Sequence, residues 1–190
     1  MNKPENVKII LKNISKRFGK ENITALDSLS ITFDENILHG IIGPDGAGKT
    51  TLIRILSGLI SKEIGSIEYL VDGSSVDFKD IRPFISYMPS SASLYPDLSI
   101  LEHLDFFRRL YMLDYNEYKR KIEELLSITG LKDFRNRRVG QLSGGMYKKA
   151  GLMCALLSSP SVLILDEPTN GVDPISRREF WELLYRLVNE

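Results

Sequence analysis

The fold of this 190-residue chain is decided by the stretch Gly43-Pro44-Asp45-Gly46-Ala47-Gly48-Lys49-Thr50. Its spacing is G-x-x-x-x-G-K-[ST], in which glycines let backbone N–H groups turn toward an anion with no Cβ in the way. The apolar run Leu38–Ile42 precedes it and the amphipathic segment Thr50–Leu59 follows. This order predicts a strand, a phosphate-binding loop and a helix, and it disfavours the alternative of a plain glycine turn.

The chemistry of such a loop assigns a role to each polar residue. Backbone N–H groups and the positive end of the following helix cradle the phosphate oxygens. The ammonium of Lys49 neutralises the β- and γ-phosphates, and the hydroxyl of Thr50 is placed to bind Mg²⁺. The sequence therefore predicts a site for a magnesium-bound nucleoside triphosphate.

Two acids close a second apolar run. Ser161–Leu165 reads as a strand buried on both faces, and Asp166 and Glu167 follow it directly. Because doubly wound sheets bind ligands at the carboxyl ends of their strands, we expect Asp166 to hold Mg²⁺, directly or through water. Glu167 would then act as general base on the attacking water. Taken without the phosphate loop, the same pair fits a surface turn after a strand equally well.

The remaining elements follow from periodicity and capping signals. Helices are expected after Ser99, whose partner in a capping box is Glu102, after Asp114, after Gly144-Gly145, and from Pro174 onward. Further strands are expected at 7–11, 29–33, 37–42, 67–71 and 85–88. Strands that alternate with helices predict an α/β fold with a parallel sheet, and the all-helical stretch 90–158 predicts an inserted subdomain.

Composition excludes several classes of protein. Lys plus Arg (25) balances Asp plus Glu (25), so no basic excess points to nucleic acid. The single cysteine, Cys154, has no partner for a disulfide, which favours a reducing cytosol and a core role. His39 and His103 are expected to be packing or surface residues rather than ligands. No apolar run approaches the roughly 20 residues of a membrane span, so any link to a membrane would go through a partner.

Leu142-Ser143-Gly144-Gly145-Met146 resembles the signature motif of ABC transporters, and it lies just before the carboxylate strand, as in that family. The other motifs follow in the family's order. Phe18 resembles the aromatic residue that stacks on adenine. The stretch Gly43–Thr51 resembles the Walker A motif, with Thr51 as its last residue. Ser161–Glu167 resembles the Walker B motif, and Asn170–Asp173 resembles the D-loop.

This resemblance implies a P-loop NTPase: a RecA-like parallel core, an N-terminal antiparallel β-subdomain and an inserted helical subdomain. It implies one ABC ATPase domain over 1–190, divided at about 1–89, 90–158 and 159–190. The family works as a head-to-tail dimer with ATP between the domains. Ser143 and the N–H groups of Gly144 and Gly145 would therefore meet the γ-phosphate held by the partner domain, and Asp173 would lie at the dimer contact.

The residue sequences of three motifs, at 43–51, 94–99 and 172–179, are similar to those of ABC-2 type exporter ATPases. Some of these carry two ATPase domains in one chain, and the first of the two is the nearest resemblance. It implies a motor subunit that hydrolyses Mg·ATP, pairs with a second ATPase domain and a membrane permease, and lies at the cytoplasmic face of the membrane. Tyr95, Phe106, Phe107 and Tyr111 read as subdomain core, or as a groove for a partner helix.

The sequence departs from the family at three points. Ser90 stands where the family has a Gln that touches Mg²⁺ and the attacking water, and Met146 stands where Gln often ends the signature. The switch histidine would lie beyond Glu190. The sequence also stops inside an expected helix, so we expect the C-terminal part of the core to be missing, which puts activity of these residues alone in doubt. Two alternatives stay open: a degenerate half-site paired with an active one, which Ser90 suggests, and a soluble ABC ATPase acting on ribosomes or DNA.

Overall fold

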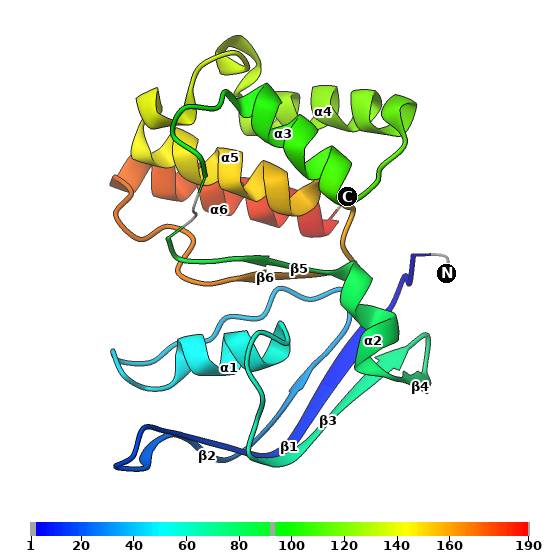
Figure 1. Ribbon diagram of the computed structural model, residues 1–190, viewed down its shortest axis with the longest axis vertical. Coiled ribbons are helices and arrows are strands. Elements are labelled where there is room, and N and C mark those ends of the chain that lie inside the picture. Colours follow the sequence, from blue (N-terminus) through cyan, green and yellow to red (C-terminus); the bar gives the residue numbers. More distant parts are fainter. Residues whose placement is uncertain (1–2, 92–93, 190) are drawn as a thin grey trace. The chain divides into compact units, whose positions relative to one another are not determined.

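The computed structural model describes residues 3–91 and 94–189 of the chain. It divides into two compact units, residues 1–85 and residues 86–190. The first unit is mainly β-sheet and the second mainly helix (Figure 1).

The first unit is built on a four-stranded antiparallel sheet in the order β2-β1-β3-β4. Its strands are β1 (Val7–Phe18), β2 (Ile23–Phe33), β3 (Ile64–Val71) and β4 (Ser74–Val76). The register places Ile9 of β1 between Phe33 of β2 and Tyr69 of β3. The strands expected at 7–11, 29–33 and 67–71 are thus parts of longer strands, and the antiparallel β-subdomain is confirmed.

Helix α1 (Lys49–Leu56) follows the phosphate loop and buries the apolar residues Leu52, Ile53, Ile55 and Leu56. The odd-numbered residues Val7, Ile9 and Leu11 of β1 are buried, in keeping with the two-residue period of a strand. Short helices α2 (Phe78–Ile81) and η1 (Arg82–Phe84) end the unit.

The strand expected at 37–42 is wrong. The backbone is irregular from 37 to 44, and no described strand pairs with it. The apolar side chains of Ile37, Leu38 and Ile42 remain 59%, 38% and 97% exposed. An apolar run becomes a strand only where a neighbouring strand completes its hydrogen-bond ladder. In the described part of this unit the four strands of the antiparallel sheet pair with one another and not with residues 37–42.

In the second unit, β5 (Ile85–Met88) pairs with β6 (Val162–Leu165), close to the predicted ranges. The long connection between them carries α3 (Ile100–Leu110), α4 (Tyr115–Thr129), η2 (Lys132–Phe134), η3 (Val139–Gln141) and α5 (Gly144–Leu156). Such a crossover is what parallel strands require, and both strands run in the same direction in Figure 1. Helix α6 (Pro174–Asn189) follows β6.

The helix boundaries follow from the capping residues that the sequence indicates. The Ser99 hydroxyl accepts from the N–H of Glu102, whose carboxylate accepts from the N–H of Ser99, a complete capping box. Asp114 accepts from two N–H groups of the first turn of α4, and Gly130 ends that helix in the left-handed conformation. The helical insertion is therefore confirmed down to its caps.

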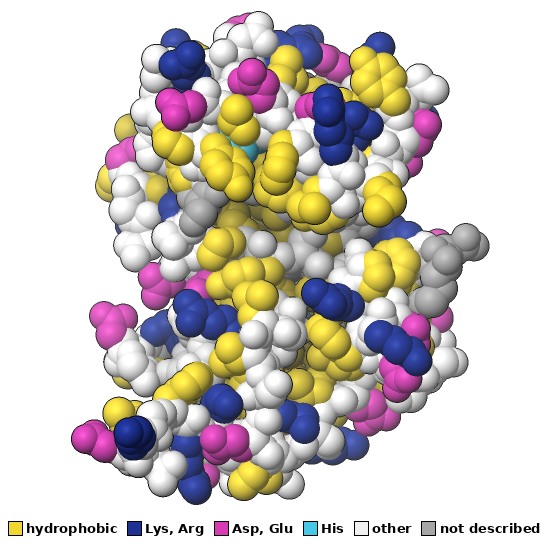
Figure 2. Space-filling view, in the orientation of Figure 1, with side chains coloured by type: hydrophobic (Ala, Val, Ile, Leu, Met, Phe, Trp, Pro, Cys, Tyr) yellow, Lys and Arg dark blue, Asp and Glu magenta, His cyan; other side chains and the backbone are white. Residues whose placement is uncertain are grey.

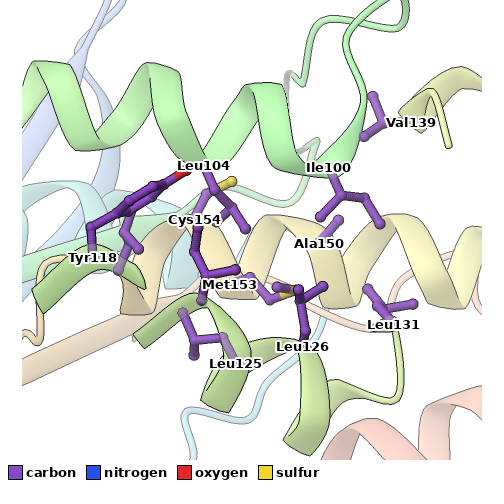
Figure 3. Packing of buried hydrophobic residues seen from close by; sticks show 12 residues of the cluster. Ile100, Leu104, Tyr118, Leu125, Leu126, Leu131, Val139, Ala150, Met153 and Cys154 are labelled. Atoms are coloured by element: carbon purple, nitrogen blue, oxygen red, sulfur yellow. The ribbon is translucent and has the colours of Figure 1, made fainter. Parts of the chain in front are cut away.

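Helix α5 is the centre of this unit. On one side Met153 and Cys154 pack among residues of α3 and α4 such as Leu104 and Leu126 (Figure 3). On another side Leu152 joins a second cluster that includes residues of α6. Cys154 is a core residue, as expected, and burial raises the pKa of its thiol to about 12.

Candidate functional site

The backbone of the phosphate loop explains two of its glycines. Gly46 and Gly48 have φ values of 80° and 87°, in the left-handed region that residues with a side chain rarely adopt. A Cβ on Gly48 would lie 2.2 Å from the carbonyl oxygen of Ala25. A side chain at position 48 would therefore push the loop away from β2, whereas Gly46 has open space around it.

Lys49 folds back over its own loop. Its ammonium donates to the carbonyl oxygens of Gly43 and Pro44, both at 2.8 Å. Helix α1 has no side-chain cap and no acid in its first turn, which Lys49, Thr50 and Thr51 form. Because the first N–H groups of a helix have no carbonyl partner within it, this loop offers donors, a dipole and a cation to an anion.

The other residues of the loop and the predicted adenine contact lie on the surface of the same unit. Asp45 and Ala47 are exposed, and the N–H of Ala47 donates to the carbonyl of Pro44 at 3.2 Å. Phe18 ends β1, is 42% exposed, and has the ammonium of Lys16 5.4 Å from its ring centre. Its ring is open to a stacking ligand, and its contact with adenine stays a prediction.

The carboxylate pair lies in the second unit, where β6 ends. Asp166 is buried, its N–H donates to the carbonyl of Met88 at 3.0 Å, and its Oδ2 accepts from the hydroxyl of Tyr87 at 3.3 Å. The ladder between β5 and β6 thus continues to Asp166 and fixes where its carboxylate points. Sequence reasoning missed Tyr87, because nothing in the sequence shows which side chain of β5 faces the end of β6.

Glu167, in contrast, is exposed at a turn. Its φ of 46° is unusual for a residue with a side chain, and such strain often accompanies functional sites. Asn170 closes the turn, its N–H donating to the carbonyl of Glu167 at 3.1 Å and its side-chain amide donating to Oε2 at 3.0 Å. The carboxylate therefore faces solvent in an orientation that Asn170 sets.

A buried lysine joins this site without having been predicted. Lys148 of α5 is 8% exposed, and its ammonium donates to the carbonyl oxygen of Ser90. Burial lowers the pKa of Lys148, and the negative charge of Glu167 acts in the opposite direction. In the sequence Lys148 follows the signature motif as one of two adjacent lysines, and nothing there separates it from its neighbour.

The signature motif begins α5. Ser143 is its N-cap, with the hydroxyl accepting from the N–H of Met146 at 3.3 Å. A Cβ on Gly145 would lie 2.5 Å from Cβ of Ser176, and one on Gly144 would lie 3.6 Å from the carbonyl of Gly171. The structure thus brings the signature and the segment after Glu167 together, and only a glycine fits at position 145 without displacement.

Asp173 is occupied as a helix cap. Its Oδ1 accepts from the N–H groups of Ile175 and Ser176 at 3.1 and 3.0 Å, at the start of α6. The hydrogen bonds from Ser176, followed by that from Ile175, hold the pKa of this carboxyl below its usual value. Its expected place at a dimer contact stays a prediction.

The predicted magnesium ligands fit the ion by their chemistry. The Thr50 hydroxyl and the Asp166 carboxylate are hard oxygen donors, which Mg²⁺ prefers. Residues 3–91 and 94–189 hold no group of three or more His, Cys, Asp or Glu side chains that could bind a metal. Thr50 belongs to the first unit and Asp166 to the second, so their sharing one ion is part of the proposal below.

Both histidines behave as expected. His103 is buried, with Nε2 accepting from the N–H of Tyr95 at 2.8 Å and Nδ1 donating to the carbonyl of Ser99 at 3.0 Å. These two hydrogen bonds fix the orientation of the ring in the core. His39 is exposed and bonds to the carbonyl of Asp34 at 3.0 Å.

The chain was compared with protein families and with curated relatives. Residues 26–170 match the family described as "ABC transporter". The chain is 40% identical over 182 residues to "Probable multidrug ABC transporter ATP-binding protein YbhF" of Escherichia coli (strain K12), covering 96% of this chain and 32% of that protein. It is 37% identical over 182 residues to "Daunorubicin resistance ATP-binding protein DrrA3" of Streptomyces coeruleorubidus, covering 95% and 56%. The chain thus spans about a third of the length of the first relative and just over half of the second.

Among solved structures, the chain is similar to a dimeric post-hydrolysis state of the ATP-binding cassette MJ0796 bound to ADP and Pi. The TM-score is 0.78 at 27% identity, over 95% of this chain and 82% of that one. This similarity confirms the P-loop NTPase fold.

Proposed function

Because the chain belongs to the ABC transporter family of ATP-binding domains, we propose that it binds Mg·ATP and hydrolyses it as the motor subunit of an exporter. The observation that carries the proposal is the phosphate loop, with two left-handed glycines and the ammonium of Lys49 above its carbonyls. That arrangement offers N–H donors and positive charge in the pattern that a triphosphate requires.

The proposed roles follow from the chemistry of each side chain. Lys49 leaves its loop carbonyls for the β- and γ-phosphates, and Thr50 and Asp166 hold Mg²⁺. The ion, when bound, neutralises charge on the transferred phosphoryl group. Glu167 takes the proton of the attacking water, since its exposed carboxylate faces solvent and Asn170 orients it.

We propose that the active form is a head-to-tail dimer. The start of α5, with Ser143, Gly144 and Gly145, is a second helix terminus able to receive an anion. It would meet the γ-phosphate held by a second ATPase domain, with Asp173 near the contact. The dimeric state of the similar ADP-bound cassette supports this arrangement.

We propose that a membrane permease is the other partner and that the protein lies at the cytoplasmic face of the membrane. No helix within the described ranges is both long and apolar enough to span a bilayer. The four aromatic residues that the sequence indicates as subdomain core, or as a groove for a partner helix, differ in their burial. Phe107 packs on the core, while Tyr95, Phe106 and Tyr111 are 58%, 42% and 40% exposed. Figure 2 shows hydrophobic side chains over the α3 region, a surface suited to a partner helix.

The relatives favour the exporter role over the other classes. One is named as a probable multidrug transporter protein and another as a daunorubicin resistance protein. The balanced charge of the chain argues against a nucleic-acid partner. Co-purification of the full-length protein with a membrane permease is the test, and recovery with ribosomes instead would overturn this part of the proposal.

Hydrolysis is tested by phosphate release from the full-length protein. Glu167→Gln keeps the shape of the side chain but removes its basicity, so turnover should fall about a hundredfold or more while ATP binding persists. Glu182→Gln is the matched control, because Glu182 pairs with Arg178 on the surface of α6. Equal turnover of the wild type and Glu167→Gln would refute the assignment of the general base.

A degenerate ATP site is the second candidate, and Ser90 is the observation that favours it. A serine side chain is too short to reach as the family's Gln does. Tight ATP binding with no phosphate release by the wild type, in complex with a partner domain that does turn over, would select this reading.

A further inference from the structure

The buried lysine of α5 occupies an uncommon position for its residue type. Lysines are almost never fully buried unless they are paired. Lys148 is 8% exposed and donates to the Ser90 carbonyl, which is two residues beyond the end of β5. The desolvation of an ammonium is costly, so a buried lysine with defined partners indicates a constraint on those partners.

The same ammonium also acts on the end of the neighbouring strand. Burial lowers the pKa of Lys148, and the negative charge of Glu167 opposes this effect. Residues Met88 and Asp166 are already joined by a backbone hydrogen bond of 3.0 Å. Lys148 thus hydrogen-bonds the backbone two residues beyond Met88, and its charge interacts with Glu167, one residue beyond Asp166.

Helix α5 holds the segment after β5 at a second point. The hydroxyl of Tyr147 accepts from the N–H of Leu94 at 3.0 Å. Adjacent residues of one helix thus bind Ser90 and Leu94 through the backbone. Lys149, the next residue, behaves differently: it pairs with Glu179 of α6 at 2.8 Å.

We propose that Lys148 is a positioning residue for ATP hydrolysis, which holds the backbone of Ser90 beside the carboxylate of Glu167. This inference rests on the proposed function. It assigns to Lys148 of α5 part of the coupling between the segment after β5 and the hydrolysis site, which the short side chain of Ser90 does not supply. The link is electrostatic at Glu167 and a charge-assisted hydrogen bond at Ser90.

The test uses the full-length protein with three substitutions. Lys148→Met removes the charge at similar length, Lys148→Arg keeps it, and Lys149→Met removes the neighbouring lysine as a control. Steady-state phosphate release gives kcat and KM for ATP. Amide hydrogen exchange of peptides containing 88–91 reports the tether independently of turnover.

Lys148→Met should lower kcat at least tenfold with KM changed less than twofold, and it should speed exchange at 88–91 at least threefold. Lys148→Arg should retain most of the wild-type kcat and most of the protection from exchange at 88–91. Lys149→Met should match the wild type in both measurements. A kcat of Lys148→Met within twofold of wild type would overturn the inference. If Lys148→Met does not fold, a Lys148→Gln variant with wild-type kcat overturns it equally.

The two proposals fail differently. If the wild type neither binds ATP nor releases phosphate, the proposed function fails. Exchange then decides the remaining claim, because unchanged exchange at 88–91 in Lys148→Met shows that the lysine does not hold Ser90. If the wild type turns over and Lys148→Met does so equally, only the further inference fails.

Discussion

Two helices of this protein begin at glycine-rich turns, and the two beginnings differ in what they offer an anion. Helix α1 starts after the left-handed Gly48, has no side-chain cap, and carries Lys49 folded over the loop. Helix α5 starts at Ser143, whose hydroxyl caps the first turn, and its Gly145 is packed against Ser176. The first is an uncapped loop and helix start with its own cation, whereas the second is a helix start that the Ser143 side chain caps.

This difference indicates how two helix starts could contribute differently to one proposed ATP site. A loop with a lysine and strained glycines can hold a triphosphate alone. A capped start gains from an anion only when another domain brings it already bound. The comparison thus predicts that changes at α1 alter nucleotide affinity and that changes at α5 alter assembly.

The largest expected effect is at Gly48. Gly48→Ala would place a Cβ 2.2 Å from the Ala25 carbonyl at a φ of 87°, so the free energy of unfolding should fall by about 2 kcal/mol or more. Gly46→Ala is the control: its φ is 80° but its surroundings are open, and it should cost only about 1 kcal/mol. Urea unfolding measures both, and equal losses would show that the contact with Ala25 does not matter.

Lys49→Ala should remove a charge-assisted contact to phosphate worth about 1.5–3 kcal/mol, and ATP affinity should fall at least tenfold. Fluorescent nucleotide titration measures this. Lys62→Ala, at a half-buried lysine beyond the end of α1, serves as a charge control and should bind ATP normally. An unchanged dissociation constant for Lys49→Ala would contradict the phosphate-loop assignment.

Ser143→Ala removes the N-cap of α5 and should cost about 1 kcal/mol of stability. Because its proposed anion comes from a partner, ATP affinity of a single domain should stay the same while ATP-dependent dimerisation weakens. Light scattering with and without ATP, in a Glu167→Gln background, measures the assembly. Loss of affinity without loss of assembly would reverse the roles assigned to the two helix starts.

The smallest effect concerns the start of α6, at Asp173. Its folded-state pKa is lowered by the hydrogen bonds of Ser176 and Ile175, so its contribution to stability is present above the unfolded value near 3.9 and is lost as the pH falls through the lower folded value. Asp173→Asn should therefore flatten the pH dependence of unfolding below about pH 4. An identical acid profile for both proteins would contradict this.

The sequence predicted those features whose interacting residues lie close together in the chain, and it missed those that depend on distant residues. Caps such as Ser99 and Asp114 were predicted, because their partners lie within three residues. The strand predicted at 37–42 was wrong, because a strand forms only by pairing with segments that can lie far away in the chain. For the same reason Tyr87 and Lys148 escaped notice. Their role comes from contacts 79 and 58 residues distant, and no spacing rule reports those.

Helix α5 is packed into two clusters and carries both Ser143 at its cap and Lys148 five residues later. At 1.5 Å per residue the two positions are about 7.5 Å apart along one rigid rod. Because a rigid helix moves as one body, a displacement at its N-terminus also displaces the residues of its following turns. If the proposed roles of Ser143 and Lys148 hold, a tilt of α5 would change both the contact with a partner domain's nucleotide and the position of Ser90 relative to Glu167, so that the two proposed ATP sites would respond together.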